Sequence, residues 1–94
     1  MNIEETKSIV KKVIAEALGS EIEIKDSMQL IGGEALLDSM KLVEVCLSLE
    51  DAADENGFEF DWTSDSAMSK SRSMFRTVEA LAEEFLNQSN KGNQ

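Results

Sequence analysis

Apolar residues near the start of the chain recur at three- and four-residue spacing, a period that is typical of an amphipathic α-helix. The pattern predicts a helix over residues 3–18, and Gly19 is a suitable residue to end it. The apolar face of this helix consists of Val10, Val13, Ile14, Ala17 and Leu18.

Residues 20–38 show no sustained period and predict a long loop. Its apolar residues are Ile22, Ile24, Met28, Leu30, Ile31, Leu36 and Leu37. We expect them to hold the loop against the core, while Gly32-Gly33 permits a turn with positive φ. A loop of this length inside a small domain usually has a function.

A second helix is predicted over residues 39–56, with Asp38 as its N-cap and Gly57 just beyond its end. It differs from the first helix because it has two apolar faces. One stripe consists of Leu42, Val45, Cys46, Leu49 and Ala53, and the other of Met40, Val43 and Leu47, interleaved with Glu44 and Asp51. A helix buried on one side needs only the first stripe, so the core of a monomer does not explain the second.

The segment after this helix alternates apolar and polar residues, with Phe58, Phe60 and Trp62 on one side and Glu59 and Asp61 on the other. Alternation of this kind indicates an extended segment with its aromatic side chains inward. No strand partner is evident, so the pattern predicts an extended loop.

The C-terminal third predicts a short helix over residues 64–70, a connector over 71–76 and a last helix over 78–87. Thr77 is the expected cap, and Val78, Leu81, Ala82 and Phe85 are the expected inward residues. Met74 and Phe75 are expected to pack under the bundle. The polar end, residues 88–94, predicts a disordered tail. The sequence therefore predicts an all-α fold, a small three-to-four-helix bundle in one domain over residues 1–87.

Net charge narrows the possible partners. The 94 residues carry a net charge of −10, and residues 21–66 hold 13 acids against two bases. This balance argues against nucleic acid or an anionic membrane as a partner and favours a protein with a basic patch. The chain has one cysteine, no basic-then-apolar leader and no apolar run of the ~20 residues that span a bilayer. We therefore expect a cytoplasmic monomer that does not insert into membranes.

The residue types present exclude several chemistries. Ser39 has no histidine in the chain to activate it, and Lys41 lies on another side of the helix, so a catalytic triad is excluded. An EF-hand is excluded because Ala52 and Thr63 occupy the loop positions that need carboxylates. One cysteine and no histidine also exclude a structural zinc site. We predict that the chain is not an enzyme and that Cys46 is a small buried apolar residue.

Ser39 itself has two interpretations. A serine at the first turn of a helix can help to cap it. A phosphodiester attached at the same position would be favoured by the unpaired amides and the dipole of the helix.

The stretch LIGGEALLDSMKLVEVCLSLE resembles the core of acyl carrier proteins and of related peptidyl and D-alanyl carrier proteins. In that family a long loop ends in an Asp-Ser-Leu or Asp-Ser-Met triplet that opens an acidic second helix. The resemblance extends over nearly the whole chain, up to the final helix that FRTVEAL opens. It implies a helical bundle of the acyl-carrier-protein type.

The resemblance also implies specific roles. Ser39 would carry covalent phosphopantetheine, whose thiol holds the cargo as a thioester, and Asp38 would be recognised by a phosphopantetheinyl transferase. The residues implied in docking are Met40, Val43, Glu44, Leu47, Glu50 and Asp51, and Asp54 and Glu55 extend the acidic frame. The other implied partners are an acyl-loading ligase or synthase and acyl-accepting enzymes with basic patches.

Two departures refine the interpretation. Lys41 stands where fatty-acid carriers commonly have an acid, and SAMSKSRSMFRTVEAL looks like specialised bacterial carriers of secondary-metabolite and surface-glycan pathways. We therefore expect an acyl carrier in fatty-acid-like, secondary-metabolite or surface-glycan biosynthesis. The alternatives are an aminoacyl or D-alanyl carrier, and an acidic helical docking module that is never modified. A cargo cleft is compatible with the sequence, as is a fully packed core; the candidate walls are Leu42, Val45, Cys46, Phe58, Phe60 and Trp62.

Overall fold

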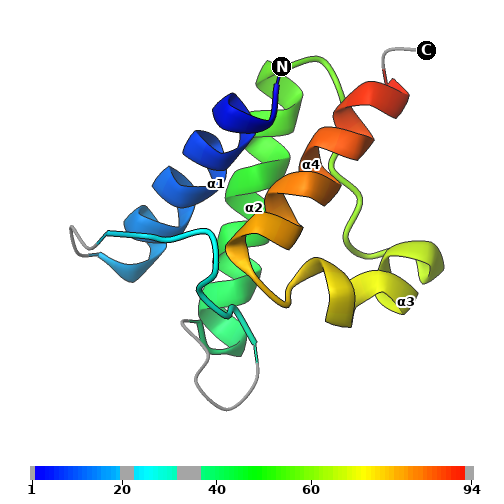
Figure 1. Ribbon diagram of the computed structural model, residues 1–94. Coiled ribbons are helices and arrows are strands. Elements are labelled where there is room, and N and C mark those ends of the chain that lie inside the picture. The colour runs from blue at the N-terminus through cyan, green and yellow to red at the C-terminus, as the bar shows by residue number, and fades with distance from the viewer. Residues whose placement is uncertain (1, 20–22, 32–36, 93–94) are drawn as a thin grey trace.

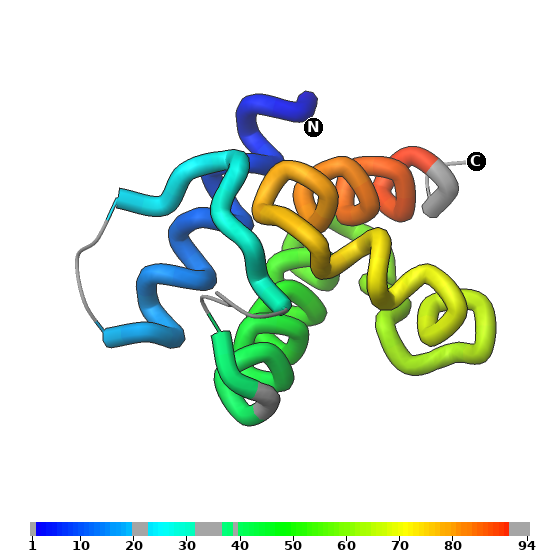
Figure 2. The backbone as a smooth tube through the Cα atoms, turned by 60° about the horizontal axis from the view of Figure 1, so that its bottom comes forward, coloured from blue at the N-terminus to red at the C-terminus, as the bar shows by residue number. Residues whose placement is uncertain are grey.

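Four α-helices form a small all-α bundle in the computed structural model, which describes residues 2–19, 23–31 and 37–92. The helices are α1 (Ile3–Leu18), α2 (Ser39–Glu55), α3 (Asp65–Met74) and α4 (Val78–Gly92). Figure 1 shows α1 beside α2, α4 crossing in front of α2, and the shorter α3 at the edge of the bundle; α1 packs against both α2 and α4. Figure 2, which brings the bottom of the bundle forward, again places α3 at the edge. No helix in the described part of the chain has the length and apolar character needed to cross a membrane.

The first helix has the predicted bounds. The Asn2 side chain accepts a hydrogen bond from the Glu5 N–H at 2.9 Å, which satisfies one of the amides at the start of α1. At the other end Gly19 adopts a left-handed conformation with φ of 70°, and its N–H donates to the carbonyls of Ala15 and Glu16. A glycine adopts this conformation without steric cost, so the prediction that Gly19 ends the helix is confirmed.

The second helix also agrees with the sequence pattern, to within one residue at its end. The Asp38 carboxylate accepts from the Lys41 N–H at 2.8 Å, so Asp38 is the N-cap. Asn56 is the C-cap, and Gly57 follows it with φ of 81°. These two signals, an acidic N-cap and a glycine just beyond the end, fix the length of α2.

The core lies between the three long helices and is closed by two of the extended-loop aromatics. The Phe85 ring is fully buried, with the Phe58 ring at 5.0 Å and the Phe60 ring at 5.4 Å between centroids. Tilted and edge-on geometries of this kind are favourable for aromatic rings. The segment around Phe60 runs without a strand partner in the described residues, so the predicted extended loop is confirmed.

The described part of the long loop, residues 23–31, is bound to α1 and to the start of α4. The Asp26 carboxylate pairs with Lys7 at 2.8 Å and with Lys11 at 2.7 Å, both from α1. The backbone of the loop forms hydrogen bonds with the backbone of residues 76–79. Ile24, Leu30 and Leu37 are buried and Met28 and Ile31 are partly buried, which confirms that the loop is held to the core. The predictions for Ile22, Leu36 and Gly32-Gly33 lie outside the described residues.

The loop supplies the first hydrogen bonds of α4. The Val78 N–H donates to the Met28 carbonyl and the Glu79 N–H to the Asp26 carbonyl, each at 3.0 Å. The Ala80 N–H donates to the Thr77 hydroxyl at 3.1 Å, which confirms Thr77 as a cap. Amides at the start of a helix have no partner within the helix, so here a distant loop provides two of the acceptors.

Three predicted boundaries in the C-terminal third are wrong. The helix expected over 64–70 begins at Asp65 and continues to Met74, so most of the expected connector 71–76 is helical. Its end is buried, because Met74 and the adjacent Phe75 pack into the bundle as predicted. The last helix does not stop at residue 87 but runs to Gly92, so residues 88–92 belong to it. Only residues 93–94 of the expected tail lie outside the described part of the chain.

Candidate functional site

The start of α2 is the site that the sequence singles out. Asp38 caps the helix through its bond to the Lys41 amide, and Ser39 is the first helical residue. The structure describes the backbone of Ser39 but not its side chain. The first turn contains no acidic residue, although the rest of the helix is rich in acids. At this end of the helix the carboxylate of the N-cap Asp38 already lies in the field of the helix dipole and accepts from one of its amides, that of Lys41.

An apolar stripe lies on the outer face of α2 and begins directly after Ser39. Met40 is 77% exposed, Val43 44% and Leu47 50%. Their three- and four-residue spacing places them on one side of the helix. The prediction of a second, outward apolar stripe is thus confirmed, and no described residue covers it.

Acidic side chains surround this stripe. The exposed acids of α2 are Glu44, Glu50, Asp51, Asp54 and Glu55. The only cation of the helix, Lys41, lies 3.4 Å from the Glu44 carboxylate. A half-exposed pair of this kind contributes little to stability. The surface therefore combines an apolar centre with an acidic frame, which is complementary to an apolar surface edged by basic residues.

The opposite face of α2 belongs to the core. Val45, Cys46, Leu49 and Ala53 are fully buried, and Leu42 is partly buried. Burial, with a smaller effect from the Glu50 charge, raises the pKa of the Cys46 thiol to about 12. The thiolate is the reactive form of cysteine, so Cys46 is an inert packing residue, as predicted.

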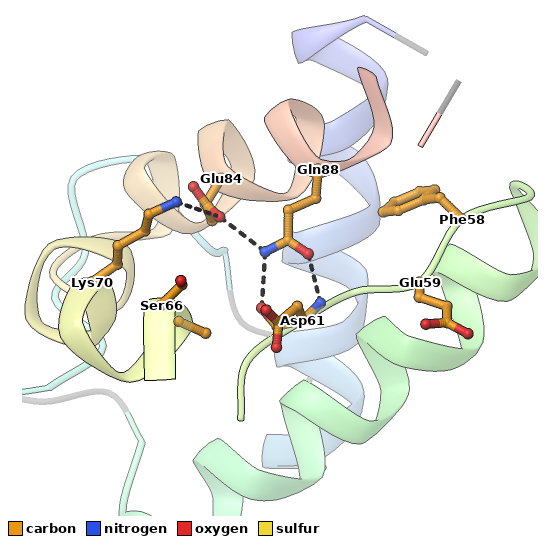
Figure 3. Close-up of a pocket in the computed structure, with 8 residues that line it drawn as sticks. Phe58, Glu59, Asp61, Ser66, Lys70, Glu84 and Gln88 are labelled. Atoms are coloured by element: carbon orange, nitrogen blue, oxygen red, sulfur yellow. Dashed lines mark hydrogen bonds and ion pairs between the residues drawn. The ribbon is translucent and has the colours of Figure 1, made fainter. Parts of the chain in front are cut away.

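A hollow of about 500 Å³ lies between residues 58–61, α3 and α4, and Figure 3 shows the residues that line it. The Gln88 side chain joins two of its walls. Its oxygen accepts from the Asp61 N–H at 2.5 Å, and its nitrogen donates to the Asp61 carbonyl at 2.8 Å. The same nitrogen donates to Glu84 at 2.9 Å, and Lys70 from α3 lies 3.9 Å from the same carboxylate oxygen. The polar groups of Gln88, Glu84 and Lys70 that line this hollow are therefore already paired within the protein.

Asp61 also organises the turn into α3. Its carboxylate accepts from the Ser64 hydroxyl at 2.5 Å and from the backbone N–H groups of Ser64 and Thr63. These bonds, led by that of the Ser64 hydroxyl, lower the pKa of Asp61. Ser64 in turn caps α3 by accepting from the Ala67 N–H. The sequence pattern placed Asp61 on the polar side of the extended segment and Gln88 in a disordered tail. It gave no sign of the bond between them, because the two residues lie 27 positions apart.

Two further hollows lie in the described part of the chain. One of about 640 Å³ is lined by Phe58 and Phe60 together with acids of α2 and of the extended segment, and another of about 300 Å³ lies between α1 and α2. Neither these two nor the hollow of Figure 3 is lined by Leu42, Val45, Cys46 or Trp62. Trp62 is partly buried, and its indole N–H is buried without a hydrogen-bond partner in the described residues.

No three His, Cys, Asp or Glu side chains in the described ranges are grouped in a way that could hold a metal ion. The acids of α2 are spread along the helix rather than gathered at one point. Their arrangement suits an extended contact surface more than a single coordinated ion.

Comparisons with protein-family models, with curated proteins and with solved structures found no match to this chain.

Proposed function

We propose that this chain is a carrier protein that holds acyl intermediates as a thioester on phosphopantetheine attached to Ser39. The observation that carries the proposal is the exposed apolar stripe of Met40, Val43 and Leu47, which starts one residue after that serine and is framed by acids. A carrier must present its attachment point to several enzymes in turn, and a docking surface beside that point meets this need.

The residues around Ser39 fit the attached group. A phosphodiester is an anion, and at the N-terminus of α2 the helix dipole would favour it, beside the Asp38 carboxylate that caps the helix. Asp38 is held in place by its bond to the Lys41 amide, so its backbone sets the position of the next residue, Ser39. When attached, the group supplies a thiol on a flexible arm, a reactive group that the buried Cys46 does not offer.

The outer surface of α2 would bind the partner enzymes. Its apolar stripe would contact the partner enzyme, and its acids would steer a basic partner toward it. Contacts led by exposed charges weaken as salt rises, because exposed charges are screened within about 10 Å at 0.1 M salt. The affinity of each partner should therefore be low and salt-sensitive, which allows the carrier to move between enzymes.

The same surface also supports a second candidate, an interaction module that binds a basic partner without any modification. The exposed stripe is equally consistent with this function. The two candidates differ in one respect, which is whether Ser39 is a covalent attachment site.

Intact-mass measurement separates them. The purified chain is incubated with coenzyme A, Mg²⁺ and a broad-specificity phosphopantetheinyl transferase. We expect the mass to rise by one phosphopantetheine in the wild type, not to rise in Ser39→Ala, and to rise in the control Ser48→Ala, which alters an exposed serine of the same helix. No mass increase on a folded wild-type chain that starts unmodified would contradict the carrier function and leave the interaction module.

A further inference from the structure

A basic segment interrupts the acidic sequence at α3. The stretch SAMSKSRSMFRT, residues 66–77, contains three cations and no acid, in a chain whose net charge is −10. Its electrostatic character is therefore the opposite of that of α2. The resemblance in the sequence assigns the docking of partners to α2 and leaves this segment without a role.

Three residues of this segment form a line in the sequence at four-residue spacing, of which Met68 and Arg72 lie on the outer side of α3 and Arg76 lies beyond its end. Met68 is 60% exposed, and Arg72 and Arg76 are exposed. Residues four apart on a helix are neighbours on its surface, which applies to Met68 and Arg72, and Arg76 follows two residues after Met74, the last residue of α3. The buried residues of the helix, Ala67 and Met74, lie on its other side.

Exposed serines complete this surface. Ser69 and Ser73 each follow a member of the line by one residue and are exposed. We call the five residues Met68, Ser69, Arg72, Ser73 and Arg76 the α3 outer face. It has one large apolar side chain at one end, two guanidinium groups and two hydroxyls.

The two arginines have no internal partner in the part of the chain that the structure describes. Neither Arg72 nor Arg76 lies within 4.0 Å of a described carboxylate, and no side-chain hydrogen bond of either is present there. Lys70 differs, because it lies 3.9 Å from the Glu84 carboxylate. Each free guanidinium offers five N–H donors in a planar fork that matches a carboxylate.

We propose that the α3 outer face is a docking surface for a protein partner that presents a local patch of carboxylates beside a shallow apolar pocket. The carboxylates would pair with Arg72 and Arg76, and the flexible Met68 side chain would enter the pocket. Methionine suits this role because its side chain adapts to irregular apolar surfaces. Arg–carboxylate pairs can form two parallel hydrogen bonds, which gives the contact geometric specificity as well as charge.

Charge decides between a protein with such a patch and other anionic partners. Nucleic acids and anionic membranes are bound through clusters of several cations, about four to eight for a membrane surface. The α3 outer face has two, on a chain that is repelled overall by polyanions. A local patch of carboxylates on a protein requires only a few matching cations.

The acidic face of α2 in a second copy would offer similar chemistry. Two chains of net charge −10 repel each other, however, which disfavours this occupant. The proposal does not depend on modification of Ser39. It gives the molecule two docking faces of opposite sign, α2 for a basic partner and α3 for a local patch of carboxylates.

The test is an NMR titration of the ¹⁵N-labelled full chain with two synthetic helical peptides at low salt. One peptide carries glutamates beside a leucine stripe, and the other is identical except for lysines in place of the glutamates. We expect the acidic peptide to shift the amide resonances of residues 68–76 and the basic peptide to shift those of residues 40–51. Raising the salt should weaken both.

Variants identify the residues responsible. Arg72→Glu/Arg76→Glu should weaken binding of the acidic peptide by about tenfold or more, and Met68→Ala should weaken it less. The control Lys12→Glu/Lys25→Glu makes the same change in net charge at exposed positions elsewhere and should bind almost as the wild type does. Circular dichroism establishes that each variant is folded, and Arg72→Ala/Arg76→Ala replaces the charge reversal if that variant is not.

Three results would overturn the proposal. The acidic peptide could leave residues 68–76 unshifted at millimolar concentration. The control variant could lose as much affinity as the arginine variant, in which case net charge alone explains binding. The same resonances could move on simple dilution of the protein, in which case a second copy occupies the face.

Discussion

Gln88 connects α4 to the extended segment, and its removal should destabilise the protein measurably. The sequence pattern placed this residue in a disordered tail, whereas the structure places it in α4 with two hydrogen bonds to the Asp61 backbone. We expect Gln88→Ala to leave the N–H and C=O of Asp61 to water and to loosen the segment that carries Phe58 and Phe60. These two rings cover Phe85 at the centre of the core.

The magnitude follows from the two bonds. A hydrogen bond contributes about 0.5–1.5 kcal/mol net to the free energy of unfolding, so two contribute about 1–3 kcal/mol. Asp61 is exposed and Gln88 is partly exposed, so water replaces part of the loss and the lower half of this range applies, about 1–2 kcal/mol. For a domain of this size 1 kcal/mol corresponds to roughly 4–8 °C in Tm.

Urea unfolding measures this change directly. Trp62, the only tryptophan, follows Asp61 in the chain and provides a fluorescence signal from the segment concerned. Asn87→Ala is the matched control, because Asn87 is an exposed polar residue of the same helix turn. We expect the control to be neutral or slightly stabilising, since alanine favours a helix. A chain that ends at residue 87 should lose more than Gln88→Ala, because it also loses the buried Ser89.

The opposite result would be that Gln88→Ala and Asn87→Ala unfold at the same urea concentration. In that case the Gln88 contacts would contribute nothing to stability. If a chain ending at residue 87 had wild-type stability, this result would support the predicted domain boundary at residue 87.

Two further predictions concern titratable groups. Because burial raises the pKa of the Cys46 thiol to about 12, iodoacetamide at pH 8 should label this thiol only after the protein unfolds. Mass spectrometry of native and urea-treated samples measures the labelling. Rapid labelling of the native protein would contradict the burial of Cys46. Hydrogen bonds from Lys11 and Lys7 lower the pKa of Asp26 below its ordinary value of 3.8. Above pH 3.8 the ionised carboxylate therefore stabilises the fold. This contribution is lost as the pH falls through the lower pKa that Asp26 has in the folded state. The difference in urea midpoint between the wild type and Asp26→Asn should therefore shrink between pH 7 and pH 2, and a constant difference would show that the charge is not responsible.

The sequence pattern predicted α1 and α2 well because their signals are local. An apolar period of three to four residues, a capping side chain such as Asp38 and a glycine such as Gly19 all act within one or two turns. The outward stripe of α2 was also visible in the sequence, since its exposure follows from having more apolar residues than one buried face requires. The sequence therefore predicted the bounds and the apolar faces of α1 and α2, because contacts within one or two helical turns set them.

The C-terminal third was predicted less well because its stability comes from distant contacts. The serines of α3 favour caps and turns over helix interiors, so the local signal ended at residue 70, whereas the burial of Met74 and Phe75 extends the helix. Likewise α4 continues past residue 87 because Gln88 meets a segment 27 residues away. The pairing of Asp26 with two lysines of α1 had no signal in the sequence for the same reason.

The bond pattern at the start of α4 has a consequence for hydrogen exchange. The first amides of a helix usually exchange quickly, because they face water. In this protein the amides of Val78 and Glu79 donate to carbonyls of the loop near Met28, about fifty residues earlier in the chain. They can exchange only when that loop separates from α4, and the loop is also held to α1 through Asp26. Slow exchange at this helix end would therefore report the opening of the whole assembly rather than the fraying of one helix.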